Sequence, residues 1–235
     1  MLMQQRLCPS EDAISTIFFD MDNTLFDLVG AKLSACERVV EEIGEGSRDD
    51  LFGYFLNSGW GFEDFRNIAD FLRDRNCYSE SSYETCSRIY DTVKLESIVP
   101  YPGVPETLAE LRHRGFQLGI ISDAFSRDAE RRLDKTGLNR SFDLVVTCDL
   151  TGKKKPAPEP FRYALHQLDA EPSEVILVGD SPHRDMEPAR KLGMQTVYAR
   201  YGDRFSGTRV STHADFIIDS MEELLPIVPE RPGIS

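Results

Sequence analysis

The chain has 235 residues, of which 40% are apolar and 29% charged, a composition typical of a globular protein with a proper core. This length predicts one domain of ordinary size, with room for a smaller inserted one. The formal net charge of −13 argues against a basic nucleic-acid-binding face, and no stretch approaches the roughly 20 apolar residues of a membrane span.

The N-terminal residues 1–11 are polar and lack the apolar centre of a signal peptide, so we expect a flexible leader. No pair of cysteines has the two-residue spacing of a zinc or redox site. Reduced thiols and a cytoplasmic location are therefore expected. Cys36 and Cys86 lie in helical patterns, which favours burial as small apolar side chains. The five cysteines are Cys8, Cys36, Cys77, Cys86 and Cys148.

The first predicted strand covers residues 15–20, where an apolar run ends abruptly in Asp20 and Asp22. Two carboxylates at positions i and i+2 of a strand end can be splayed apart by the turn that follows. One could then act on a substrate while the other transfers a proton. The alternative is an ordinary strand with a polar turn, because Asp and Asn favour turns for local reasons.

Residues 26–99 show only helical periodicity. Gly44 to Ser47 and Asn57 to Gly59 supply breaks between the helices. An all-helical insert directly after the first strand predicts a cap domain at 26–99. The three apolar stripes are Ala35, Val39, Val40 and Ile43, then Phe62, Phe65, Ile68, Ala69 and Leu72, and last Tyr83, Cys86, Ile89, Tyr90 and Val93.

From residue 100 onward, short apolar runs alternate with helical patterns. Such alternation predicts a Rossmann-like α/β fold, in which a parallel sheet has helices on both faces and binds ligands at the carboxyl ends of its strands. Residues 12–25 and 100–235 would form this core domain. The predicted strands are 117–122, 142–147, 174–179, 194–199 and 214–219, and the predicted helices are 102–114, 126–136, 159–168, 186–192 and 220–227.

Polar residues follow four of the predicted strands. Asp20 and Asp22 follow the first, Ser122 and Asp123 the second, a run of lysines that ends at Lys155 the third, and Asp180 to Asp185 the fourth. Carboxylates cannot crowd together in ionised form without a cation, and all-oxygen ligation suits Mg²⁺. A serine and a lysine at the same edge suit a phosphate group.

These residues fall in four ordered motifs. They are Asp-x-Asp-x-Thr-Leu at 20–25, the serine at 122, Lys155-Pro156, and Gly-Asp-Ser-x-x-x-Asp at 179–185. From residue 15 to about 228 the chain therefore resembles the haloacid dehalogenase-like hydrolase superfamily, in its magnesium-dependent phosphatase branch with a helical cap of the C1 type. The resemblance implies hydrolysis of the phosphomonoester of a small metabolite through an aspartyl-phosphate.

The resemblance also implies a role for each motif residue. Asp20 would be the nucleophile, and Asp22 would protonate the leaving oxygen and later deprotonate water. Ser122 and the backbone amides after it, beginning at Asp123, would bind phosphoryl oxygens, and Lys155 would offset the negative charge. Mg²⁺ would be held by Asp20, the main-chain carbonyl of Asp22, Asp180 and Asp185, the last directly or through water.

Several alternatives remain open. Asp22 argues against a dehalogenase, which needs no general acid, and neither cap lysine, Lys32 or Lys94, sits in a pattern expected of a phosphonate hydrolase. A phosphoglucomutase-type phosphotransferase would use the same core, and a non-catalytic binding or regulatory protein would retain only the fold. The acid at Asp123 departs from the common motif, and a role for His183 or Arg184 is open. The substrate could be a sugar phosphate, glyceraldehyde 3-phosphate, phosphoglycolate or a nucleotide, and the protein a monomer or small homo-oligomer.

Overall fold

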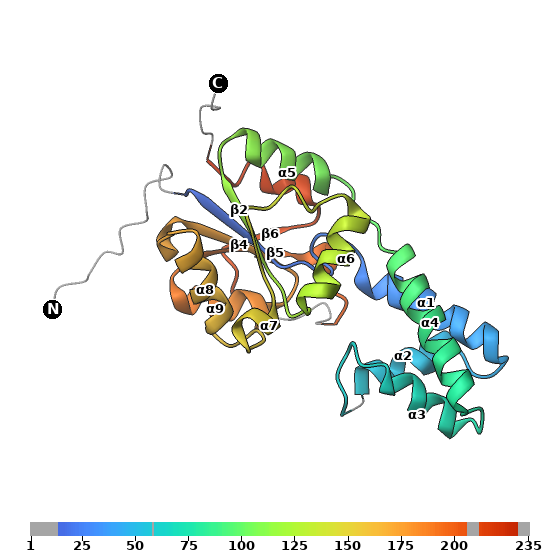
Figure 1. Cartoon of the computed structure of the whole chain (residues 1–235). Coiled ribbons are helices and arrows are strands. Elements are labelled where there is room, and N and C mark those ends of the chain that lie inside the picture. The colour runs from blue at the N-terminus through green and yellow to red at the C-terminus, as the bar shows by residue number, and fades with distance from the viewer. Residues whose placement is uncertain (1–13, 58, 206–211, 230–235) are drawn as a thin grey trace. The chain divides into compact units, whose positions relative to one another are not determined.

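The computed structural model describes residues 14–57, 59–205 and 212–229 (Figure 1). The chain forms two compact units, a sheet unit up to Phe26 and from Pro100 onward, and a helical unit of Asp27–Val99. The sequence pattern placed these divisions after residues 25 and 99. The predicted leader 1–11, with Cys8, lies outside the described residues.

The sheet unit contains a six-stranded sheet in the order β3-β2-β1-β4-β5-β6, in which every neighbouring pair is parallel. The predicted α/β fold class is thereby confirmed, and each strand lies within one of the six predicted segments. Every residue of β1 and β4 is buried, as expected for central strands covered on both faces. The strands are β1 Thr16–Phe19, β2 Gln117–Ile121, β3 Leu144–Val146, β4 Val175–Gly179, β5 Gln195–Ala199 and β6 Phe216–Ile218.

Helices cover both faces of this sheet (Figure 1). Phe18 of β1 packs into a core with Phe161 and Ala189 from two of the helices. Gly119 of β2 is required there, because a Cβ at this position would lie 2.8 Å from the Phe18 ring. The helices of the sheet unit are α5 Val104–His113, α6 Ser126–Thr136, α7 Cys148–Thr151, α8 Glu159–Gln167 and α9 Glu187–Leu192.

Most predicted elements differ from the structure by only one or two residues at their ends, and three further differences stand out. The segment 220–227 is wrong as a helix, because only Met221–Leu224 forms a single 3₁₀ turn. The helix predicted at 186–192 begins one residue later and is preceded by a π-helical turn, Pro182–Met186. The four-residue helix α7 has no counterpart in the prediction, since so short a segment carries no periodicity.

The helical unit consists of four helices packed around their own core. Asp27 caps the first helix by accepting a hydrogen bond from the Gly30 amide, and Gly44 ends it in the left-handed conformation. The predicted apolar stripes supply the interior, in which the Phe55 and Tyr90 rings stack at 4.8 Å. The helices are α1 Leu28–Ile43, α2 Arg48–Asn57, α3 Arg66–Asp74 and α4 Glu80–Glu96.

Both lysines of the helical unit are used in its own packing. The Lys32 ammonium donates to the Phe62 carbonyl and lies over the Phe55 and Phe62 rings. Lys94 is buried and pairs with Glu63 at 3.4 Å. None of the described helices is both long enough and apolar enough to span a bilayer.

Candidate active site

The site begins in the tight turn that follows β1. Asp20 is the first residue after the strand, and its amide still donates to the Val178 carbonyl at 2.8 Å. Asn23 adopts the left-handed conformation with φ 65°, which asparagine tolerates better than most residues. The backbone of Gly202 packs so closely on this turn that a Cβ there would lie 1.7 Å from the Asn23 carbonyl oxygen. The turn that carries Asp20 and Asp22 is therefore packed tightly against Gly202.

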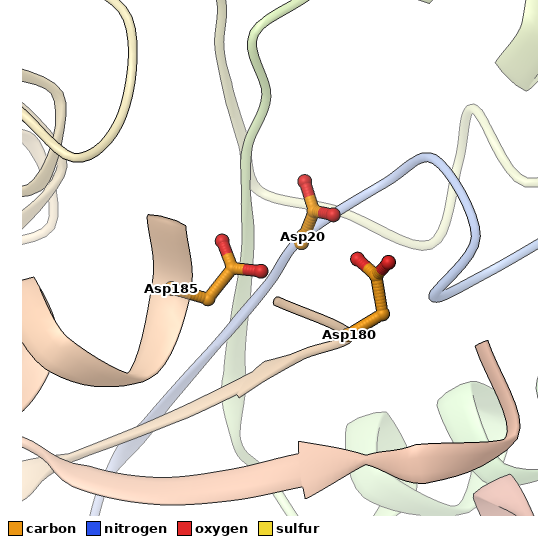
Figure 2. A group of neighbouring side chains, drawn as sticks. All are labelled: Asp20, Asp180 and Asp185. Atoms are coloured by element: carbon orange, nitrogen blue, oxygen red, sulfur yellow. The ribbon is translucent and has the colours of Figure 1, made fainter. Parts of the chain in front are cut away.

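Three predicted metal ligands come together at the carboxyl edge of the sheet. Asp20, Asp180 and Asp185 are all buried, and one carboxylate oxygen from each lies within 4.8 Å of the others. Figure 2 shows these side chains converging from two segments, Asp20 from the end of β1 and Asp180 and Asp185 from the segment that follows β4. The Oδ2 atom of Asp20 is buried without a hydrogen-bond partner among the described residues. An unpartnered buried carboxylate oxygen is costly unless a cation or ligand occupies the site.

Lys155 joins two of these carboxylates. Its Nζ donates to Asp20 Oδ1 and to Asp185 Oδ1, each at 2.6 Å, and its side chain is only 1% exposed. The neighbouring Lys153 and Lys154 are exposed. A single ammonium therefore orients both carboxylates.

The end of β2 supplies the second part of the site. Ser122 is buried, and its Oγ accepts a hydrogen bond from the Ala124 amide at 3.1 Å. The Asp123 carboxylate accepts from the Lys155 backbone amide at 2.8 Å and from Arg184 Nη1 at 3.3 Å. The unusual acid at this position is therefore paired with two donors that belong to other motifs.

Asp22 lies outside the three-carboxylate cluster. Its Oδ2 accepts a 2.7 Å bond from Nη1 of Arg132, a residue of α6 whose side chain is 2% exposed. Sequence reasoning missed Arg132. The available signal was its helical spacing, since Arg132 shares the buried face of α6 with Ala129 and Leu133.

The pKa values of the three acids in the cluster are shifted in different directions. Burial acts to raise the pKa of Asp20, but the positive charges of Lys155 and Arg184 leave that pKa below its ordinary value. For Asp180, burial together with the charges of Asp20 and Asp185 raises the pKa well above the ordinary value. Burial also raises the pKa of Asp185, although Lys155 opposes the effect. Asp20 is thus kept ionised, whereas the ionised forms of Asp180 and Asp185 are disfavoured in this cluster.

The family model described as haloacid dehalogenase-like hydrolase matches residues 17–199. The chain is 28% identical to pyrophosphatase PpaX of Bacillus mycoides, over 94% of this chain and 99% of the relative. It is 31% identical to a phosphoglycolate phosphatase of Aquifex aeolicus over 79% and 84% of the two chains. It is 29% identical to a glyceraldehyde 3-phosphate phosphatase of Methanocaldococcus jannaschii over 92% and 97%.

Among solved structures, the chain resembles a phosphatase from Thermococcus onnurineus with a TM-score of 0.66 and 26% identity. The match covers 93% of this chain and 99% of that one. The similarity therefore extends over both units and not only over the sheet unit that carries the carboxylates.

Proposed function

The chain belongs to the haloacid dehalogenase-like hydrolase family, and from that membership we propose that it is a Mg²⁺-dependent phosphatase acting on small phosphorylated metabolites. The observation that carries the proposal is the environment of Asp20. One oxygen of this buried carboxylate is held by Lys155, and the other is left without a partner beside Asp180 and Asp185. The relatives named above act, by their names, on pyrophosphate or on phosphate monoesters, which supports the same reaction class here.

The residues present fit a magnesium ion. Three buried carboxylates with oxygens within 4.8 Å of one another offer the hard oxygen ligands that this ion prefers. Asp20, Asp180 and Asp185 would hold it, together with the main-chain carbonyl of Asp22. Bound Mg²⁺ shields the negative charge of the phosphoryl group from that of the nucleophile.

In the first step Asp20 attacks phosphorus, and the bond from phosphorus to the leaving oxygen breaks. The lowered pKa of Asp20 keeps this carboxylate ionised at neutral pH. Asp22 gives its proton to the leaving oxygen, so that an alcohol departs and an aspartyl-phosphate remains. Lys155 offsets the charge that Asp20 and the phosphoryl group bring together.

In the second step Asp22 takes a proton from water, which attacks phosphorus and releases phosphate from Asp20. Phosphoryl oxygens would be held by Ser122 and by the Asp123 amide. Within the described ranges this amide donates no hydrogen bond to another residue, so it can serve a ligand.

We further propose that the helical unit Asp27–Val99 serves as a cap that selects the substrate. The engagement of Lys32 and Lys94 inside that unit disfavours Schiff-base chemistry of the phosphonate hydrolase type. The described cysteines, Cys36, Cys77, Cys86 and Cys148, are all free thiols, with Cys36 and Cys86 buried as predicted, and this supports the proposed cytoplasmic location.

The proposal is tested by measuring phosphate release from a panel of small substrates with Mg²⁺ and with excess EDTA. The panel contains phosphoglycolate, glyceraldehyde 3-phosphate, pyrophosphate, sugar phosphates, nucleotides and p-nitrophenyl phosphate. We expect release that requires Mg²⁺ and that disappears in Asp20→Asn. A folded, Mg²⁺-binding protein that releases no phosphate from any of them would contradict the proposal and favour a phosphotransferase or a non-catalytic role.

A further inference from the structure

Arg184 and Asp123 meet across the end of the central strand. In the sheet, β1 lies between β2 and β4, and Asp20 stands directly after β1. Asp123 follows β2, and Arg184 lies in the π-helical turn after β4, so the two residues come from the strands on either side of β1. Their 3.3 Å contact between Nη1 and Oδ2 therefore spans the edge of the sheet from which Asp20 projects.

The guanidinium of Arg184 is held at the same edge of the sheet as the carboxylate cluster. Its partner Asp123 also accepts from the backbone amide of Lys155, whose ammonium donates to Asp20. A second cationic side chain, besides that of Lys155, is therefore held at the sheet edge from which Asp20 projects.

Arg184 has N–H groups available to bind a ligand, whereas most of the N–H groups of the Lys155 ammonium already donate to carboxylates. The Lys155 side chain is 1% exposed, and two of the three hydrogens of its ammonium are directed at Asp20 and Asp185. The Arg184 side chain is 38% exposed, and Nη1 is its one nitrogen that donates to another side chain in the described part of the molecule. A planar guanidinium with free N–H groups is well suited to a tetrahedral anion.

The carboxylate of Asp123 contacts both Arg184 and the backbone of Lys155. Oδ1 accepts from the Lys155 backbone amide and Oδ2 accepts from the Arg184 guanidinium. A phosphate site does not need an acid here, and an acid would repel a phosphate if it faced one. Asp123 instead accepts hydrogen bonds from both cationic residues and so orients them.

We propose that Arg184 is a second cationic ligand of the phosphoryl group, held in place by Asp123, which acts as a positioning residue for Arg184 and Lys155. This inference rests on the proposed phosphatase function and adds to it a phosphate-binding residue at a variable position of the fourth motif. Arg184 would bind non-bridging phosphoryl oxygens of the substrate and of the product phosphate.

The test measures two quantities with Mg²⁺ present, kcat/KM for p-nitrophenyl phosphate and the Kd of inorganic phosphate by titration calorimetry. For Arg184→Gln we expect kcat/KM to fall and the Kd to rise by about tenfold to a hundredfold, the usual effect of losing a charged hydrogen bond. Arg184→Lys should recover part of both losses because it restores the charge but not the planar donor pair.

Asp123→Asn keeps an acceptor for the Lys155 amide and removes the charge that holds Arg184. We expect a smaller loss than in Arg184→Gln, and the double variant should be no worse than Arg184→Gln alone, because the two residues act as a unit. His183→Gln is the matched control, since His183 is on the same turn but 74% exposed and paired with Glu187. This control should match the wild type in both quantities.

An Arg184→Gln variant with unchanged kcat/KM and unchanged phosphate Kd would overturn the inference and leave the ion pair with Asp123 a purely structural one, visible only in the melting temperature. A wild-type protein without phosphatase activity would instead contradict the proposed function. The phosphate Kd of the variants would still decide whether Arg184 binds the anion.

Discussion

Asp20, Asp180 and Asp185 repel one another when no metal is bound. We therefore predict that removing the charge of Asp180 stabilises the metal-free protein. In Asp180→Asn, a negative charge is removed that lies within 4.8 Å of the oxygens of Asp20 and Asp185. Two like charges at that separation repel by about 3 kcal/mol at an effective dielectric constant of about 20. Part of this gain is lost with the attraction to Arg184, whereas the asparagine Oδ1 can still accept the long 3.5 Å hydrogen bond from Thr24. We therefore expect the variant to be more stable than the wild type by about 1–2 kcal/mol in EDTA.

The pH dependence of this effect follows from the raised pKa of Asp180. A carboxyl group whose pKa is higher in the folded state binds its proton more tightly there than in the unfolded chain. It favours folding at low pH, and that contribution is lost as the pH rises through the folded-state pKa. The advantage of Asp180→Asn in EDTA should therefore grow from pH 5 toward pH 8.

Thermal melting of both proteins, in EDTA and in excess Mg²⁺, measures the effect. The expected difference in EDTA is an increase of about 2–8 °C for the sheet unit, and Mg²⁺ should raise the melting temperature of the wild type but not of the variant. Glu130→Gln removes an exposed charge of the same unit and should change neither value. A variant that melts at or below the wild type in EDTA, or that responds equally to Mg²⁺, would refute the reasoning.

Three further predictions concern turnover. Excess Ca²⁺ should inhibit the Mg²⁺-activated enzyme, because its looser coordination suits the reacting carboxylate less well, and full activity in Ca²⁺ alone would contradict this. Asp22→Asn should lower kcat/KM for an alkyl phosphate at least about a hundredfold but leave kcat/KM for p-nitrophenyl phosphate unchanged, because the p-nitrophenolate leaving group needs no proton. Equal losses of kcat/KM for the two substrates would show that Asp22 is not the general acid. Gly202→Ala should lower kcat by about tenfold or more, because the new methyl group displaces the turn at Asn23. Gly53→Ala, which has open space around its new methyl group, is the control and should not lower kcat. A fully active Gly202→Ala would show that the turn tolerates movement.

Much of the fold could be predicted from the sequence because its strands are strongly patterned. Near-continuous apolar runs such as 174–179 are typical of buried parallel strands, and the order of the helices between them leaves few alternatives. The failure at 220–227 has a local cause. Its apolar residues fit helical spacing, but Pro226 has no backbone N–H to continue an α-helix, and only one turn forms between Met221 and Leu224.

The candidate site was predictable to the extent that its residues follow strand ends. Asp20, Asp180 and Lys155 could be brought together by topology alone, since parallel strands share one carboxyl edge. The pairings of Arg132 with Asp22 and of Arg184 with Asp123 join residues 110 and 61 positions apart, respectively. Such contacts depend on how α6 and the π-helical turn pack, and no local spacing encodes them.

The most direct test of the account is to trap phosphate on Asp20. Asp22→Asn, incubated with radiolabelled p-nitrophenyl phosphate and Mg²⁺ and quenched in acid, should accumulate label, because the ester forms without a general acid while its hydrolysis lacks a base. Peptide mapping should place the label on Asp20, and the double variant with Asp20→Asn should carry none. Label on another residue, or none in a variant that still binds Mg²⁺ and cleaves the substrate, would contradict nucleophilic catalysis by Asp20.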